Sequence, residues 1–418
     1  MGMTITEKIL AHAAGLPAVR AGEIVNAAVD VAMMDDILGP RVEIAENMEK
    51  LGVSVWDPDR VVIVSDHYTP PANAKQAEIV KFTREWAAAH GVKNYYEFKG
   101  PCHQVMVERG HVTAGDIAIG TDSHTCAYGA VGAFSTGVGS TEMLGVLVTG
   151  EIWLRVPQSI KIEFNGELPT GVMAKDVVLK TIGKVGHAGA TYKTLEFAGS
   201  TFENMIMDER LCITNMAVEA GAKNGIIPCD EKTVEFLKST GAKTPLIYHS
   251  DPDAEYLSSF RFDASELVPQ CACPHNVDNV RPIAEVNTPI NQAYIGSCTG
   301  GRYNDLKMAA DLLRGKQIAK GIRLLVSPAS AWIWERCARD GILSDLAAAG
   351  ATILASSCGA CLGVHSGAIG AGEVCVSSTN RNFLGRMGSK KSEVYLASPL
   401  SVAASALTGR LTDPREFM

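Results

Sequence analysis

Two cysteines three positions apart, Cys358 and Cys361, lie in the segment "SSCGACLG", directly after the apolar run "ATILA". This spacing is found in thioredoxin-like redox pairs, in zinc knuckles and among the ligands of iron–sulfur clusters. A redox pair normally begins a helix near the start of a compact domain, whereas this pair comes late in a long chain. A zinc site would need a second close pair. Cys271 and Cys273 are separated by only one residue in a proline-flanked segment, and we interpret them as buried thiols.

A third cysteine, Cys298, is better placed to join the first pair. It follows the apolar run "AYIG" and precedes the helix-like stretch "YNDLKMAADLL", so its sulfur should lie near a helix N-terminus, where the thiolate that a metal needs is favoured. Three thiolates on a four-iron cluster leave one iron without a protein ligand, and Lewis-acid chemistry requires such an open position. A cluster that only transfers electrons would more often have four cysteine ligands.

Two histidines, His67 and His124, each have an aspartate within two positions, Asp66 and Asp122, at the end of an apolar run. A nearby carboxylate can orient an imidazole and stabilise its protonated form, which suits the protonation of a leaving hydroxyl. His103, in "GPCHQVM", has no acid close to it in the sequence. The two aspartate–histidine pairs therefore predict acid–base chemistry.

The segment "STNRNFLGRMG" places Asn380, Arg381 and Arg386 among small polar residues. Two arginines that converge on one turn suit the binding of carboxylates, so a di- or tricarboxylate is the expected small-molecule ligand. The segment "STGVGSTEM" resembles a glycine-rich phosphate loop, but Glu142 stands where the last glycine of a dinucleotide fingerprint belongs. We therefore do not expect a nucleotide site.

Composition narrows the class of protein. The 418 residues carry a formal charge of −8 with no basic run, which argues against nucleic acid as a partner. No stretch of about 18 apolar residues and no signal-peptide pattern occurs, so we expect a cytoplasmic protein that does not enter the membrane. Eleven cysteines spread over such a length are more typical of reduced thiols than of a disulfide framework.

The elements that must position these residues form a repeating pattern. Apolar, β-branched runs alternate with glycine or polar turns and helix-like stretches, which predicts α/β architecture with mainly parallel sheets. Five runs end at the residues singled out above, and ligands of parallel sheets bind beyond the carboxyl ends of the strands. We divide the chain into three α/β domains, residues 1–157, 158–285 and 286–418, with one site between them.

The motifs "SDH", "GPCHQ", "GTDSHT", "IGSCTGG", "SSCGACLG" and "TNRNFLGR" occur in the order found in the aconitase superfamily. The whole chain is similar to the large subunits of 3-isopropylmalate dehydratases of the two-subunit type. The resemblance implies the first three domains of the aconitase fold without its swivelling fourth domain, and one 4Fe–4S cluster held by Cys298, Cys358 and Cys361. One iron would remain free to bind substrate.

The resemblance also implies roles for individual residues. Asp66 and His67 would form the acid pair for the leaving hydroxyl, and Glu196 in "LEFAG" would join the network around the bound water. The implied catalytic residues are Asp66, His67, His103, Asp122, Ser123, His124 and Glu196. The implied carboxylate-binding residues are Asn380, Arg381 and Arg386.

A separate small subunit is implied as the partner, because we find no counterpart of the glycine–serine–arginine loop of the fourth domain. That subunit would carry the serine base and the loop that selects the substrate. Three segments depart from the resemblance: Gly300 follows Thr299 where asparagine is usual, Ala360 replaces a proline, and Asp35 and Asp36 replace a segment containing histidine or glutamine. The cysteines remain, so these departures bear on which diacid fits.

We therefore predict the large subunit of a hydro-lyase that converts 2-isopropylmalate to 3-isopropylmalate in leucine biosynthesis. The same chemistry on 2,3-dimethylmalate, homoaconitate, homocitrate or citrate remains an alternative. A non-catalytic iron–sulfur carrier or sensor is a more distant alternative, because it would need neither the aspartate–histidine pairs nor the arginines.

Overall fold

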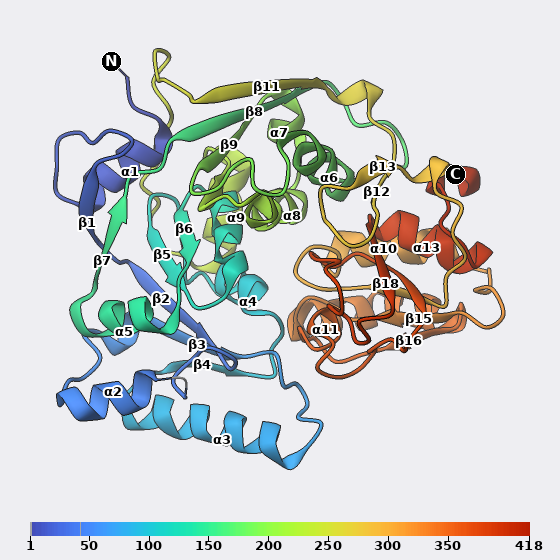
Figure 1. The fold of residues 1–418 in the computed structure, drawn as a ribbon, viewed down its shortest axis with the longest axis horizontal. Coiled ribbons are helices and arrows are strands. Elements are labelled where there is room, and N and C mark those ends of the chain that lie inside the picture. The colour runs from blue at the N-terminus through green and yellow to red at the C-terminus, as the bar shows by residue number, and fades with distance from the viewer. Residues whose placement is uncertain (1, 42) are drawn as a thin grey trace.

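A computed structural model describes residues 2–41 and 43–418 (Figure 1). The predicted α/β class is confirmed: three larger sheets consist mainly of parallel strands and are accompanied by helices. A short antiparallel ribbon of β1 (Ile24–Ala28) and β7 (Glu151–Arg155) is the fourth sheet. Within the described residues, no helix has both the length and the apolar character that crossing a membrane requires.

The first sheet has the order β4-β3-β2-β5-β6, and all its strands are parallel. Its central strands are buried runs such as "VVIVS", as expected for a sheet covered on both faces. The strands are β2 (Val31–Asp35), β3 (Val61–Ser65), β4 (Asn94–Glu97), β5 (Ile117–Gly120) and β6 (Phe134–Gly137). The helices are α1 (Ile5–Ala13), α2 (Ile44–Leu51), α3 (Ala74–Ala89), α4 (Cys102–Glu108) and α5 (Ser140–Thr149).

The second sheet is also parallel, with the order β10-β9-β8-β11. It lies at the top of the view in Figure 1. Its strands are β8 (Ser159–Asn165), β9 (Thr194–Ala198), β10 (Asn224–Ile226) and β11 (Ser258–Asp263). Its helices are α6 (Ala174–Val185), α7 (Ser200–Asn204), α8 (Met207–Asn215) and α9 (Glu231–Thr240).

The third sheet, yellow to red in Figure 1, has the order β13-β12-β18-β17-β14-β15-β16. Strand β12 runs antiparallel to both of its neighbours, β13 and β18, and the other pairings in this sheet are parallel. The strands are β12 (Gln270–Ala272), β13 (Val280–Pro282), β14 (Gln292–Ile295), β15 (Arg323–Val326), β16 (Ala351–Ile353), β17 (Val374–Ser377) and β18 (Glu393–Ala397). The helices are α10 (Tyr303–Leu313), α11 (Ala331–Arg339), α12 (Ile342–Ala348) and α13 (Pro399–Thr408). Strands β12 and β13 precede residue 285, yet they belong to this sheet. The three-domain division itself stays a prediction.

Strand order locates two ligand-binding positions. In the first sheet the chain builds outward from β2 through β3 and β4, and then returns to the other side of β2 with β5 and β6. The third sheet reverses in the same way between β14 and β17. Such switch points leave a crevice beyond the carboxyl ends of the strands. Asp35 and Asp122 lie at the first crevice, and Cys298 and Asn380 lie at the second.

A continuous hydrophobic core holds the second and third sheets together. It contains Phe197 of β9 and Leu396 of β18, both fully buried, and it also includes Ala360 from the segment between the paired cysteines. The segment between the paired cysteines is therefore part of the same core as these two sheets.

Candidate functional site

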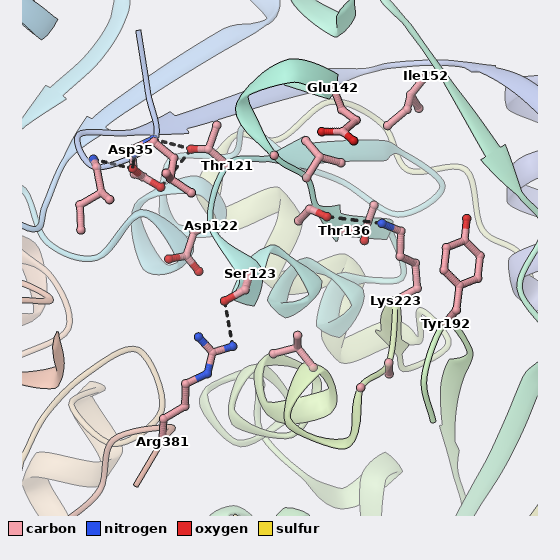
Figure 2. Close-up of a pocket in the computed structure, with 18 of the residues that line it drawn as sticks. Asp35, Thr121, Asp122, Ser123, Thr136, Glu142, Ile152, Tyr192, Lys223 and Arg381 are labelled. Atoms are coloured by element: carbon pink, nitrogen blue, oxygen red, sulfur yellow. Dashed lines mark hydrogen bonds between the residues drawn. The ribbon is translucent and has the colours of Figure 1, made fainter. Parts of the chain in front are cut away.

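A cavity of about 780 Å³ is lined by residues of the first sheet and of segments that adjoin the strands of the second and third sheets (Figure 2). In Figure 2, Arg381 extends from one side toward Ser123 and Asp122, while Lys223 and Tyr192 lie at the opposite side of the labelled group. Six of the residues predicted or flagged from the sequence line this cavity: Asp35, His67, Asp122, Ser123, Arg381 and Arg386. The structure thus brings residues from distant parts of the chain to one place.

Cys298 is held at the end of β14 by a tight turn. Ser297 before it has a φ of 72°, a left-handed conformation that non-glycine residues adopt rarely and mostly where function requires it. Two side-chain amides donate toward its sulfur: Asn215 Nδ2 lies 3.3 Å and Asn380 Nδ2 lies 3.5 Å from Cys298 Sγ. Asn380 is itself oriented by the Ser297 hydroxyl, 3.1 Å from its Oδ1. Polar donors aimed at a buried sulfur suit a thiolate ligand.

The other two cysteines lie close enough to Cys298 for their charges to interact. Burial raises the pKa of Cys358 well above its ordinary value, and the charges of Asp66, Cys298 and Cys361 raise it further. Arg386 Nη2 approaches Cys361 Sγ at 3.9 Å, and the buried Nε of Arg386 has no hydrogen-bond partner among the described residues. A metal binds the thiolate form of cysteine, so a bound cation would favour ionisation of these thiols.

Asp66 joins the cysteines to the first aspartate–histidine pair. Its backbone carbonyl accepts from the Cys358 N–H at 3.0 Å, and its Oδ2 accepts from the Cys102 N–H at 2.6 Å. His67 Nδ1 lies 2.8 Å from Asp66 Oδ1 and 3.0 Å from Asp36 Oδ1. Burial lowers the pKa of His67, but the two carboxylates outweigh this and raise it well above 6.5. Because Nδ1 is engaged, Nε2 is the atom left to hold a proton toward the cavity.

A second network centres on Asp122, at the end of β5. His103 Nε2 lies 2.9 Å from Asp122 Oδ1, and His124 donates its backbone N–H to the same oxygen at 2.7 Å. Burial by itself raises the pKa of Asp122, but His103 and His124 lower it well below 3.8. The ring of His124 lies between two carboxylates: its Nδ1 is 3.3 Å from Asp122 Oδ1, and its Nε2 is 2.7 Å from Glu219 Oε1. A chain of alternating acids and imidazoles therefore runs from His103 to Glu219, and its member Asp122 lines the cavity.

Arg381 closes this chain. Its Nε donates to Glu219 Oε1 at 2.8 Å, and its Nη2 donates to Ser123 Oγ at 2.9 Å (Figure 2). About a fifth of its side chain remains exposed. The guanidinium is therefore oriented by the protein and still able to receive an anion from the cavity.

Glu196, a predicted site residue, does not line this cavity, and its carboxylate has its hydrogen-bond partners elsewhere. Its oxygens accept from Ser250 Oγ at 2.8 Å and Tyr256 OH at 2.7 Å. The physical reason is its position within β9, between the core residues Leu195 and Phe197, rather than after the end of the strand. A strand alternates its side chains between two faces, so Glu196 points away from that core.

Three residues of the site were not selected from the sequence: Glu219, Asn215 and Asp36. Glu219 lies in a 3₁₀ turn (Met216–Ala220), and Asn215 is the last residue of α8. Neither follows an apolar run, which was the signal used to select candidates. Asp36 was noted only as part of a departing segment. Its position directly after β2, beside Asp35, was the available signal.

Asp35 and Gly300, two of the residues that differ from the usual family motifs, have structural explanations. Asp35 is fully buried, accepts from the N–H groups of Ile37 and Leu38 at 2.6 and 2.7 Å, and accepts from Thr121 Oγ1 at 3.0 Å. Burial raises the pKa of Asp35 to about 6. At Gly300, a Cβ atom would collide with the side chain of Ser378, which occupies the space a larger residue would need.

The fold and the cysteine–histidine–arginine site define the class. The family model for the aconitase family (aconitate hydratase) matches residues 8–289 and 285–409, and the chain belongs to this family.

Relatives are similar over their whole length. The chain is 48% identical to the 3-isopropylmalate dehydratase large subunit 1 of Methanopyrus kandleri over 421 aligned positions, covering 100% of each chain. It is 46% identical to the 3-isopropylmalate dehydratase large subunit of Aquifex aeolicus, covering 100% of this chain and 98% of the relative. The crystal structure of Thermococcus kodakaraensis aconitase X in its holo-form shares the fold, with a TM-score of 0.50 and 12% identity over 86% of this chain and 84% of that one.

Membership of this family implies a 4Fe–4S cluster, and the surroundings of the three cysteines fit one. The cysteines are free thiols, not disulfides. The two asparagine amides beside Cys298 and the unpartnered Arg386 Nε are donors suited to an anionic group. His103, Asp122 and His124 could hold a simple cation, since their ligand atoms lie within 4.8 Å of one another.

Proposed function

We propose that this chain is the iron–sulfur subunit of a hydro-lyase that converts 2-isopropylmalate to 3-isopropylmalate by removal and re-addition of water. One observation carries the proposal: His67, Asp122 and Arg381 line a single cavity, and the free thiol of Cys361 lies 3.9 Å from Arg386, which lines the same cavity. The names and full-length similarity of the relatives support the choice of substrate. This reaction belongs to leucine biosynthesis.

Cys298, Cys358 and Cys361 would hold the 4Fe–4S cluster. When bound, the cluster supplies a Lewis-acidic iron without a thiolate ligand, which polarises the substrate carbon–oxygen bond. Asn215 and Asn380 orient Cys298 through their amide donors. Both amides are polar but uncharged, so they position the Cys298 sulfur without forming an ion pair with it.

His67 would act on the leaving hydroxyl. Its Nδ1 is oriented by Asp66 and Asp36, and both carboxylates stabilise the imidazolium. The proton on Nε2 can then pass to the departing oxygen, and the same nitrogen can take a proton from water in the return direction. Since Asp66 also accepts from the Cys358 N–H, the acid and the ligand segment are held in one arrangement.

The substrate carboxylates would be bound from the opposite wall. Arg381 presents a guanidinium already aligned by Glu219 and Ser123, and planar guanidinium groups match carboxylates through two parallel hydrogen bonds. Arg386 lines the same cavity and would bind the second carboxylate. His103 and His124, held by Asp122, would complete the polar wall around the reacting carbons.

A separate small subunit would complete the active site. The described cavity offers acids, imidazoles and guanidinium groups, while the resemblance assigns the base that removes the carbon-bound proton to a serine of a partner subunit. The small subunit would also carry the loop that selects the alkyl group. This chain without its partner should therefore show little turnover.

The test uses the chain and its small subunit reconstituted with iron and sulfide without oxygen. The complex is offered a panel of alkyl-substituted maleates together with aconitate, and hydration is followed by loss of the double bond. The proposal expects the fastest hydration with isopropylmaleate and none with Cys298→Ser. Preference for aconitate or dimethylmaleate would correct the substrate, and no turnover on any member would contradict the enzyme assignment.

A further inference from the structure

Lys175 is buried directly behind the ligand segment of Cys298. It is the second residue of α6, and only 1% of it is exposed. Its Nζ donates to Thr299 Oγ1 at 2.8 Å, to the carbonyl of Thr379 at 3.0 Å and to Met216 Sδ at 3.2 Å. Thr299 follows Cys298 in sequence, and Thr379 precedes Asn380. The ammonium group therefore joins both segments that shape the surroundings of the Cys298 sulfur.

All three acceptors of Lys175 are uncharged. Within residues 2–41 and 43–418, Lys175 Nζ forms no ion pair with a carboxylate. Asp305 and Asp208 share a small cavity with it, but the hydrogen bonds of their carboxylates go to the backbone N–H groups of Arg302 and Asn304. A buried ammonium without a counter-ion loses hydration that neutral acceptors replace only in part. Burial accordingly lowers the pKa of Lys175.

A second buried cation lies in the segment that follows Cys298. Arg302, four residues after Cys298, is fully buried and donates its Nε to Gln104 Oε1 at 3.0 Å. Its two terminal nitrogens have no hydrogen-bond partner among the described residues. Two cations thus lie behind a site that would bind three thiolates and a cluster.

We propose that Lys175 is a positioning residue whose positive charge, supported by that of Arg302, compensates the negative charge of the cluster and its cysteine ligands. The inference rests on the proposed cofactor. The cluster provides the counter-charge that Lys175 lacks, and Lys175 in turn stabilises the more negative, reduced state of the cluster. Removing this charge lowers the reduction potential and loosens the cluster, without a matching loss of stability in the cluster-free protein.

The test compares Lys175→Met and Lys175→Gln with Lys180→Met, a control on the exposed face of the same helix. The reconstituted subunit is titrated electrochemically for the potential of the bound cluster, and iron release to a chelator is timed. Thermal midpoints are measured with and without the cluster. Both Lys175 variants should shift the reduction potential to more negative values and release iron about tenfold faster. Tenfold is the lower end of the loss in metal affinity that is typical when a residue supporting the ligands is replaced. Lys180→Met should match wild type.

The outcomes separate charge from packing and from the cofactor assignment. An unchanged reduction potential in both Lys175 variants would overturn the inference. A Lys175→Gln variant that behaves like wild type would also overturn it, because hydrogen bonds without a positive charge would then suffice to hold the cluster. Burial raises the pKa of Asp305 to about 7, so its carboxyl is charged at pH 8. At that pH, Asp305→Asn removes a negative charge near Lys175 and should shift the potential the opposite way, which provides a test if the lysine variants fail to fold. A wild-type protein that binds no cluster would overturn the proposed function together with this inference, whereas a bound cluster without turnover would overturn only the function.

Discussion

Replacing Glu219 by glutamine removes the negative charge that joins His124 to Arg381. The carboxylate is 1% exposed and accepts from His124 Nε2 at 2.7 Å and from Arg381 Nε at 2.8 Å. A hydrogen bond to a charged group contributes about 1.5–3 kcal/mol, and glutamine can replace only one of the two, more weakly. Part of Arg381 is exposed, so solvent relieves some of the loss. We therefore expect Glu219→Gln to lower the free energy of unfolding by about 3 kcal/mol at neutral pH.

The pH dependence gives the effect a signature. Burial raises the pKa of Glu219, but His124 and Arg381 lower it below 4.5 overall. A carboxyl whose pKa is lowered by folding stabilises the protein above its ordinary pKa, and this stabilisation disappears as the pH falls through the lowered value. The difference between wild type and Glu219→Gln should therefore be constant above pH 4.5 and shrink below it.

The assay is urea unfolding of the reduced, metal-free protein, followed by circular dichroism between neutral and acidic pH. Glu373→Gln is the matched control, because Glu373 also pairs with an arginine, Arg323, at 2.8 Å but at the surface. Surface ion pairs contribute at most about 1 kcal/mol. A Glu219→Gln midpoint that matches wild type or Glu373→Gln would refute the reasoning.

Three further predictions follow from the same geometry. Arg381→Lys should raise KM about tenfold or more because the two-point contact with carboxylate is lost; an unchanged KM in steady-state assays of the complex would contradict it. Asp35→Asn should stabilise the metal-free protein by about 3 kcal/mol at pH 8, because charging a carboxyl whose pKa is about 6 opposes folding. Calorimetry should show that this gain in stability falls by about half at pH 5. A gain that does not depend on pH would show that the raised pKa of Asp35 is not its cause. Gly300→Ala should speed iron release, since its Cβ would collide with Ser378, and adding Ser378→Gly should reverse the effect; iron retention like that of wild type in Gly300→Ala would show that the loop adapts.

Residues that directly follow a strand could be located from the sequence. Asp122 and Cys298 each come after a short apolar run, and parallel strands deliver such residues to one edge of a sheet. The reversal of strand order at β2 and β14 then brings both edges to the cavity. Local pattern and general topology were sufficient for this part of the site.

Partners contributed by tertiary packing could not be located in this way. Glu219 contacts His124 from 95 positions away and Arg381 from 162 positions away, and its own turn has no distinctive pattern. Glu196 was assigned a role from the resemblance alone, and that role stays a prediction. Which way its side chain points depends on the register of β9 against its neighbours, and the sequence of one strand does not contain that information.

We propose that this chain supplies the cluster and the acid for a reversible dehydration completed by a small subunit. Proton NMR of 2-isopropylmalate incubated with the anaerobically reconstituted complex tests it most directly. We expect 3-isopropylmalate to appear with both subunits present, and neither product nor alkene with Cys298→Ser or with the subunit alone. Unchanged 2-isopropylmalate in the presence of an intact cluster and both subunits would contradict the account.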